Sequence, residues 1–236
     1  MPTLPLSGKL ALVTGASRGI GAATAEALAA AGAHVILTAR TSGGLEEVEE
    51  RIHKGGGHAT IAPLDLIDGE SIGRLAQAIS GRWQALDILV LNAATLGSLA
   101  SVPAIDAKEF ARLLTLNIAA PQALIAAFDA MLRASGDARV IALTSSVAAQ
   151  PRAYWGAYGA SKAALETLVN AYGEEVKNIS AIRTHIVDPG ATRTAMRARA
   201  FPGEDPSTLK EPAVVGQAIA DLILSDTASG TRKRVG

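Results

Sequence analysis

The stretch Thr14-Gly15-Ala16-Ser17-Arg18-Gly19-Ile20-Gly21 decides the fold that we expect for this chain. It joins an apolar run, residues 10–14, to an alanine-rich helical segment, residues 21–31. The three glycines allow a tight turn, close approach of the backbone to a phosphate group and close packing of helix on strand. Because the first N–H groups of the helix then face an anion, this turn predicts a dinucleotide-binding β-α unit. A glycine-rich turn alone also occurs for purely structural reasons.

Strand-like and helix-like segments alternate outward from this turn along the whole chain. The predicted strands are 10–14, 34–38, 59–64, 86–91, 139–144 and 182–187; the predicted helices are 21–31, 44–54, 68–80, 106–134, 158–177 and 212–225. Alternation of this kind, with continuously apolar strands, is typical of a parallel sheet covered on both faces. We predict an α/β fold: a Rossmann-type doubly wound parallel sheet of about seven strands or one fewer, in a single domain, residues 1–236.

The composition excludes several classes of protein. The 236 residues carry 22 basic and 22 acidic side chains, and a neutral chain argues against a nucleic-acid partner. There is no Cys, and the four His lack metal-ligand spacing, so we expect no disulfide and no metal site. The uncharged run 88–105 is too polar for a transmembrane helix, and residues 1–9 lack a signal-peptide core. We expect a cytoplasmic protein with no membrane partner.

Tyr158 and Lys162 stand four residues apart on one face of a predicted helix. A cation beside a phenol stabilises the phenolate and lowers the pKa of the phenol, which would make Tyr158 a general acid/base. A packed tyrosine beside a solvated lysine is the structural alternative.

Taken together, the glycine turn and the Tyr158–Lys162 pair resemble the two signatures of the short-chain dehydrogenase/reductase family, and the resemblance covers nearly the whole chain. It implies that Tyr158 exchanges the substrate proton, that Lys162 lowers the pKa of Tyr158 and holds the nicotinamide ribose, and that Asn117 supports a proton relay. A serine would bond the substrate oxygen. The cofactor-binding positions that it implies are Gly15, Ser17, Arg18, Gly19, Ile20, Arg40, Asp65, Leu66, Asn92, Ala93, Tyr158, Lys162, Pro189, Gly190, Thr192 and Thr194.

The resemblance leaves one choice open and shows two departures. Counting outward from the fifth strand selects Ser146 as the substrate-binding serine, and counting back from Tyr158 selects Ser145; we favour Ser146, because loops tolerate length changes better than strands. Ala94 replaces a family glycine. The chain also stops at Gly236, short of the family's usual last strand, which puts the usual C-terminal subunit contact in doubt.

The end of the second strand indicates the cofactor. An acidic residue there would bond the ribose 2′-hydroxyl of NAD, but Ala39 stands in its place and Arg40 follows. Arg18 and Arg40 together favour a 2′-phosphate, hence NADP(H), because guanidinium groups bind phosphate bidentately.

We therefore predict an NADP(H)-dependent oxidoreductase that interconverts a carbonyl and a secondary alcohol of a small molecule. The alternative is a catalytically weak NADP(H)-binding sensor or partner subunit. By the resemblance, the alanines of 119–130 suit the interface of a homodimer or homotetramer.

Three further features have two interpretations each. The segment 191–211 is either a substrate lid or a solvated connector. Tyr154 and Trp155 either line the pocket or cap the sheet edge. Arg193, Arg197 and Arg199 either favour an anionic substrate or form a solvated helical face, and the solvated face is the better supported.

Overall fold

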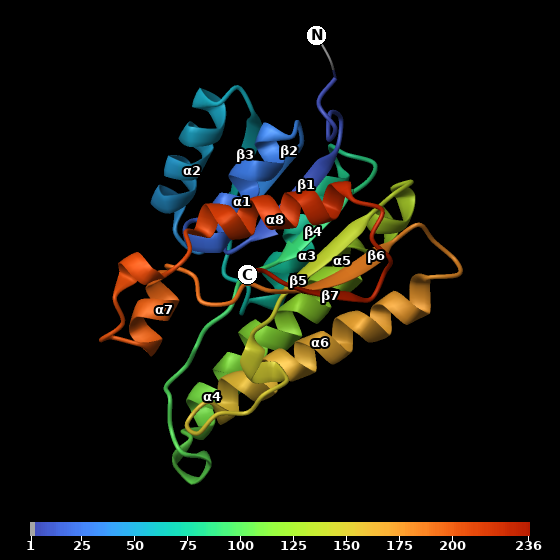
Figure 1. The fold of residues 1–236 in the computed structure, drawn as a ribbon. Helices are drawn as coiled ribbons and strands as arrows, with labels where there is room; N and C mark the ends of the chain where they lie inside the picture. Colours follow the sequence, from blue (N-terminus) through green and yellow to red (C-terminus); the bar gives the residue numbers. More distant parts are fainter. Residues whose placement is uncertain (1–2) are drawn as a thin grey trace.

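A single parallel sheet of seven strands forms the centre of the molecule (Figure 1). The computed structural model describes residues 3–236, and the strands lie in the order β3-β2-β1-β4-β5-β6-β7. They are β1 (Leu10–Thr14), β2 (His34–Ala39), β3 (His58–Pro63), β4 (Ile88–Leu91), β5 (Arg139–Leu143), β6 (Arg183–Asp188) and β7 (Thr231–Arg234). The predicted α/β fold, a Rossmann-type doubly wound sheet, is confirmed with the larger strand number.

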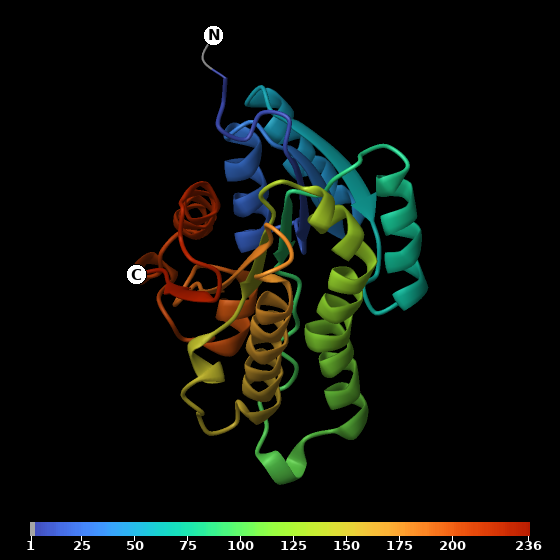
Figure 2. The same ribbon diagram turned by 90° about the vertical axis from the view of Figure 1, so that its right-hand side faces the viewer.

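Helices cover both faces of the sheet, as Figure 2 shows. Core side chains of α1 (Gly19–Ala30), α2 (Ser42–Lys54) and α8 (Pro212–Leu224) pack on one face. Core side chains of α3 (Gly69–Ser80), α5 (Ala120–Ala134) and α6 (Gly156–Val176) pack on the other. The central strands are therefore buried on both sides, which explains why they are continuously apolar.

The expectation that the chain lacks a last strand is wrong. Residues 231–234 form β7, which pairs in parallel with β6 from His185↔Thr231 to Asp188↔Arg234. The strand reads Thr-Arg-Lys-Arg, and its residues alternate between half-buried and exposed. An edge strand of this kind has a polar sequence and no apolar run, because one of its sides faces water.

The helix predicted over 106–134 is interrupted. It divides into α4 (Ala107–Leu114), a π-helical turn (Thr115–Ala119) and α5. By length and composition, residues 107–134 pass as a membrane-spanning candidate. Leu124, Phe128 and Leu132 of this segment are nevertheless buried in the core against the sheet, so it is a core helix.

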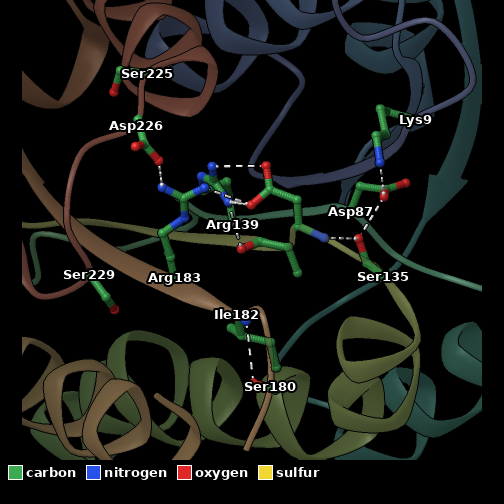
Figure 3. A network of polar contacts seen from close by, with 12 residues as sticks. Lys9, Asp87, Ser135, Arg139, Ser180, Ile182, Arg183, Ser225, Asp226 and Ser229 are labelled. Carbon is green, nitrogen blue, oxygen red and sulfur yellow. Dashed lines mark hydrogen bonds and ion pairs between the residues drawn. The ribbon is translucent and has the colours of Figure 1, made fainter. Parts of the chain in front are cut away.

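The amino-terminal edge of the sheet is held by a network of charged side chains (Figure 3). Asp87 accepts hydrogen bonds from Lys9 Nζ at 2.9 Å and from Ser135 Oγ at 2.7 Å. Arg139, which is only 3% exposed, donates from Nη2 to Asp137 Oδ2 at 3.0 Å. These contacts tie the starts of β1, β4 and β5 together and leave the carboxyl edge free for chemistry.

Candidate active site

The predicted site residues gather at the carboxyl edge of the sheet. Because the strands are parallel, the segments that follow β1, β2, β3, β4, β5 and β6 all reach this edge. Residues 15–20 follow β1, Arg40 follows β2, and Asp65 with Leu66 follows β3. Asn92 with Ala93 follows β4, Ser145 with Ser146 follows β5, and residues 189–194 follow β6. Leu66 is buried in the core, whereas the exposed Asp65 accepts a hydrogen bond from Ile67 N at 3.1 Å.

Thr14 locks the glycine turn to the neighbouring strand. Its Oγ1 donates to Val90 O at 3.0 Å and accepts from the backbone N–H groups of Asn92 at 2.9 Å and Ala93 at 3.0 Å. The side-chain amide of Asn92 donates back to Thr14 O at 2.8 Å. Asn92 and Ala93 are thereby fixed beside the turn, and their hydrogen bonds to Thr14 stabilise its conformation.

The glycines of the turn are required by its shape. Gly15 and Gly19 have φ angles of +65° and +59°, in the left-handed region that side chains disfavour. A Cβ on Gly21 would lie 2.3 Å from Gly15 O and 2.5 Å from Asn92 Nδ2. Ile20, the second residue of α1, packs half-buried against the core. The turn therefore forms a bare backbone cradle at a helix start, which fits a phosphate group.

Two exposed arginines flank this cradle. Arg18 precedes α1, and Arg40 directly follows β2, which pairs with β1. Within residues 3–236, neither guanidinium forms an ion pair shorter than 4.0 Å with an acidic group. Ser17 contacts the start of α2, since a Cβ on Gly44 would lie 3.0 Å from the Cβ of Ser17. The arrangement fits an additional phosphate on the ribose of a dinucleotide.

Tyr158 and Lys162 lie buried on α6, at 7% and 2% exposure. Lys162 Nζ donates to Leu143 O at 2.7 Å, at the end of β5, and lies 5.8 Å from the centre of the Tyr158 ring. The structural alternative of a solvated lysine is therefore wrong, because this ammonium group is held inside the protein.

The expected lowering of the Tyr158 pKa does not occur in the protein by itself. Burial raises the pKa of the Tyr158 phenol, and the negative charge of Asp188 raises it further. Burial also lowers the pKa of Lys162 to about 8, against an opposing effect of the Glu166 carboxylate. The cause in both cases is the removal of a charged form from water, which outweighs the attraction that the sequence suggests.

Asn117 lies fully buried in the π-helical turn between α4 and α5. Its Oδ1 accepts from Thr95 N at 2.9 Å, and its Nδ2 donates to Thr95 O at 2.9 Å and to Ser161 Oγ at 3.0 Å. Asn117 thus joins the loop after β4 to α6, one residue before Lys162. Its direct partner on α6 is Ser161.

The two candidate serines differ in what their hydroxyl groups contact. Ser145 Oγ accepts from Val147 N at 3.5 Å and caps the short turn that follows. Ser146 is the first residue of that turn, and within residues 3–236 its Oγ takes part in no hydrogen bond. A hydroxyl without a protein partner suits a substrate contact better, so Ser146 stays the prediction.

The segment 191–211 folds back toward the glycine turn. It contains α7 (Ala195–Ala200), and its two ends are joined where Thr192 pairs with Lys210. Thr194 caps α7 by accepting from Arg197 N at 3.1 Å, and its Cγ2 lies 3.5 Å from the Cβ position of Gly19. The start of the segment therefore contacts the glycine turn; residues 191–211 are called the lid below, and their role as a substrate lid stays a prediction.

The start of this lid is fixed by tight backbone contacts. Gly190 has a φ of +63°, and a Cβ there would lie 2.9 Å from Lys210 Nζ. Thr192 Oγ1 donates to Pro189 O at 3.0 Å. Pro189, Gly190 and Thr192 thereby set the direction in which the chain leaves β6.

Sequence reasoning missed a polar network behind Lys162. Glu166 accepts hydrogen bonds from Thr144 Oγ1 and from Arg232 Nε, the latter at 3.3 Å. Arg232 Nη2 also lies 3.7 Å from Oδ2 of the buried Asp188. The spacing of Glu166, four residues after Lys162, could have indicated that its carboxylate lies on the same helix face as Lys162 and acts on its charge. The sequence carried no signal for Arg232, because β7 was not predicted.

Within residues 3–236 there is no cluster of three or more His, Asp or Glu side chains that could hold a metal ion.

Comparison with known proteins identifies the family. A family model described as short chain dehydrogenase matches residues 9–205. The uncharacterized oxidoreductase YciK of Escherichia coli strain K12 is 36% identical over 211 residues, which cover 88% of this chain and 83% of YciK. A provisionally assigned short chain dehydrogenase from Pseudomonas syringae has a TM-score of 0.95 at 35% identity, with 100% of this chain and 97% of that one covered. Another from Shigella flexneri 2a, in complex with NADP, has a TM-score of 0.94 at 34% identity, with 99% of each chain covered. The chain belongs to the short-chain dehydrogenase/reductase family of oxidoreductases.

Proposed function

We propose that this protein is an NADP(H)-dependent oxidoreductase that interconverts a carbonyl and a secondary alcohol of a small molecule. Tyr158, Lys162, Ser146 and Asn117 are its proposed catalytic set. The observation that carries the proposal is the burial of Tyr158 and Lys162 on one face of α6, at the same sheet edge as the glycine cradle. A buried ammonium group beside a buried phenol is costly, and a proton-transfer site gives it a purpose.

The protonation of Tyr158 favours reduction as the working direction. Because burial raises the pKa of Tyr158, the phenol carries its proton at neutral pH. A protonated phenol can donate to a carbonyl oxygen as negative charge develops there, and Ser146 Oγ can donate a hydrogen bond to the same oxygen. When bound, NADP(H) supplies the hydride. Lys162, whose pKa is lowered to about 8, can return the proton through solvent near physiological pH.

The cofactor proposed is NADP(H), held by the positions that the family resemblance implies, from Gly15 to Thr194. Arg18 and Arg40 are exposed beside the cradle, and Ala39 stands where an acidic residue would repel a 2′-phosphate. The NADP bound by the Shigella relative supports this choice.

The assembly proposed is a homodimer or homotetramer, in the cytoplasm. The side chains of Gln122, Ala126 and Ala130 lie exposed along α5, on a helix whose other face is in the core. The small side chains of Ala126 and Ala130 allow two such helices to approach closely. Partners other than the substrate and a second copy are not proposed.

Replacement of Tyr158 by Phe tests the mechanism. We expect Tyr158→Phe to abolish NADPH oxidation with any accepted carbonyl compound and to change the dissociation constant of NADPH far less, because only the hydroxyl group is removed. Tyr172→Phe is the matched control, because this tyrosine lies on the same helix but bonds Asp129, at 2.7 Å. Activity retained in Tyr158→Phe would refute the mechanism. Tight NADPH binding with no turnover of a broad carbonyl panel by the unmodified protein would favour the sensor alternative.

A further inference from the structure

A small apolar cluster surrounds the ring of Tyr158, apart from the two main cores. Leu96 and Val147 are buried with Tyr158, and half-buried apolar side chains pack against them. Those side chains are Leu99, Trp155, Met196 and Ala200. They come from the loop after β4, from the loop before α6 and from the lid, so apolar groups approach Tyr158 from three segments.

Two aromatic rings, one before α6 and one in the lid, connect Tyr158 to the lid. The Trp155 ring meets the Tyr158 ring edge-on, with centres 6.1 Å apart, and lies 5.6 Å from the ring of Phe201. Phe201 also borders a cavity of about 350 Å³ between α7 and the residues that follow it, lined in part by Ala198 and Leu209. This aromatic ring can therefore shift when a ligand enters, because free space adjoins it.

The arginines of the lid are already engaged. Arg193 pairs with Glu211 at 2.5 Å. Arg197 donates to both carboxylate oxygens of Glu204, at 2.6 and 2.5 Å. The weaker of the two interpretations of Arg193, Arg197 and Arg199, a preference for an anionic substrate, is not supported, since two of the three have carboxylate partners within the lid.

Arg199 is also fixed by the protein. Its Nη2 donates to Gly97 O at 3.1 Å, which joins the lid to the loop after β4. The Arg197 guanidinium meanwhile lies 3.8 Å from the centre of the Phe201 ring, so that its charge is shared between this ring and Glu204.

The apolar surface continues outward from Trp155. Tyr154 is 63% exposed and has a φ of +71°, the one positive φ outside glycine in residues 3–236. Its carbonyl accepts from Ala100 N at 3.1 Å, beside Val102, which is 71% exposed. A strained backbone costs about 1–3 kcal/mol and persists mainly where function requires the geometry. We therefore place Tyr154 and Trp155 at the mouth of the proposed site, which is one of the two interpretations that the sequence left open.

We infer, on the basis of the proposed function, that the substrate is a carbonyl compound with a bulky apolar substituent, aryl or cycloalkyl, next to the carbonyl. The carbonyl oxygen lies at Tyr158, and the substituent packs against Trp155, Phe201 and Met196. A carboxylate or phosphate on this substituent is disfavoured, because it would lose its water while Arg193 and Arg197 are already paired with carboxylates. Arg199 donates to a backbone carbonyl and is the one lid arginine without a carboxylate partner within residues 3–236. Phe201 yields toward the adjoining cavity as the substituent enters.

Three ketones in the presence of NADPH test this substrate class. We expect kcat/KM for cyclohexyl methyl ketone to exceed that for 4-acetylcyclohexane carboxylate and that for hydroxyacetone, each by at least about tenfold. Phe201→Ala and Trp155→Ala reduce both preferences. Ile179→Ala is the matched control, because Ile179 is 70% exposed after the far end of α6 and its loss leaves both preferences unchanged.

A binding measurement separates this inference from the proposed function. The chain has two tryptophans, so Trp83→Phe leaves Trp155 as the sole fluorescent indole, read with NADP bound. A saturable change in Trp155 fluorescence with cyclohexyl methyl ketone, but not with its carboxylate analogue, supports the ligand class. If this change occurs without turnover, only the proposed function fails. Equal or better turnover of the carboxylate, or of hydroxyacetone, overturns the substrate class and leaves the oxidoreductase standing. If the protein shows neither turnover nor a fluorescence change with any of the three ketones, both the substrate class and the proposed function are overturned.

Discussion

The burial of His185 should lower the free energy of unfolding in acid, and we predict that one substitution of this residue removes the loss. It lies fully buried in β6, and both of its ring nitrogens are without a hydrogen-bond partner within residues 3–236. By the alternation of the strand, it points to the same face as Val187, which packs in the core with Ile219 of α8. An imidazolium group there would have no water and no acceptor.

The size of the effect follows from the pKa of the imidazole. Burial and, to a smaller extent, the positive charges of Arg139 and Arg183 together lower the pKa of His185 from 6.5 to about 4. Above pH 6.5 the ring is neutral in the folded and the unfolded chain. Between pH 6.5 and 4 the unfolded chain binds a proton that the folded chain does not, so the free energy of unfolding falls with pH. By pH 4.5 the loss amounts to about 2.5 kcal/mol.

The perturbation is His185→Leu, and the measurement is urea unfolding at pH 7.5, 6.5, 5.5 and 4.5 at one protein concentration. Other groups titrate in both proteins alike, so the difference between the two profiles isolates the imidazole. We expect the variant to be at least as stable at pH 7.5, because two unsatisfied nitrogens are removed, and to lose about 2.5 kcal/mol less by pH 4.5. His53→Gln, at an exposed position on α2, controls for the loss of an imidazole. Parallel profiles for the unmodified protein and His185→Leu would show that the ring has a partner, and would refute the reasoning.

Three further predictions concern the site. Arg40→Leu should weaken NADP binding by about 10- to 100-fold with little effect on NAD, in isothermal titration, because one charge-assisted contact to a 2′-phosphate is lost; NAD binding as tight as NADP in the unmodified protein would contradict the cofactor choice. Gly21→Ala should lower the free energy of unfolding by at least about 2 kcal/mol, because its Cβ would lie 2.3 Å from a carbonyl oxygen, whereas Gly43→Ala, with no atom within 4 Å, should not. Lys162→Met should abolish turnover yet stabilise the fold at pH 7 by about 2 kcal/mol. Because the pKa of Lys162 is lowered to about 8, the charged side chain costs about 3 kcal/mol of stability below pH 8, and this penalty disappears as the pH rises to 10.5. The loss of one hydrogen bond to Leu143 O offsets about 1 kcal/mol of the stabilisation. A less stable Lys162→Met would show that the ammonium group is not strained by burial.

The sequence predicted those parts of the fold whose signal is local. The glycine turn is recognisable because Gly15, Gly19 and Gly21 meet a steric requirement that no other residue satisfies. The pairing of Tyr158 with Lys162 is recognisable because helical spacing alone places both on one face. Strands β1 to β6 carry apolar runs because both faces of the sheet are covered.

The features that the sequence did not predict depend on contacts between distant segments. β7 is a polar strand of four residues, and it is a strand only because its backbone pairs with the free edge of β6. The π-helical turn at Asn117 breaks no sequence rule, yet it buries an amide among Thr95 and Ser161. The direction of the Tyr158 pKa depends on how deeply the folded chain buries the phenol, which spacing along a helix does not report.

The electrostatics of the site extend beyond the residues of the family signatures. Glu166 and Asp188 are the carboxylates that act on Lys162 and Tyr158, and each tends to raise the pKa of its neighbour. Arg232 lies within 4 Å of both carboxylates and partly neutralises them. Loss of Arg232 would leave two poorly compensated negative charges behind the catalytic pair, and both pKa values would rise together. The short polar strand β7 thus contributes to the proton affinity of the proposed active site, although it lies outside the segment that the family model matches.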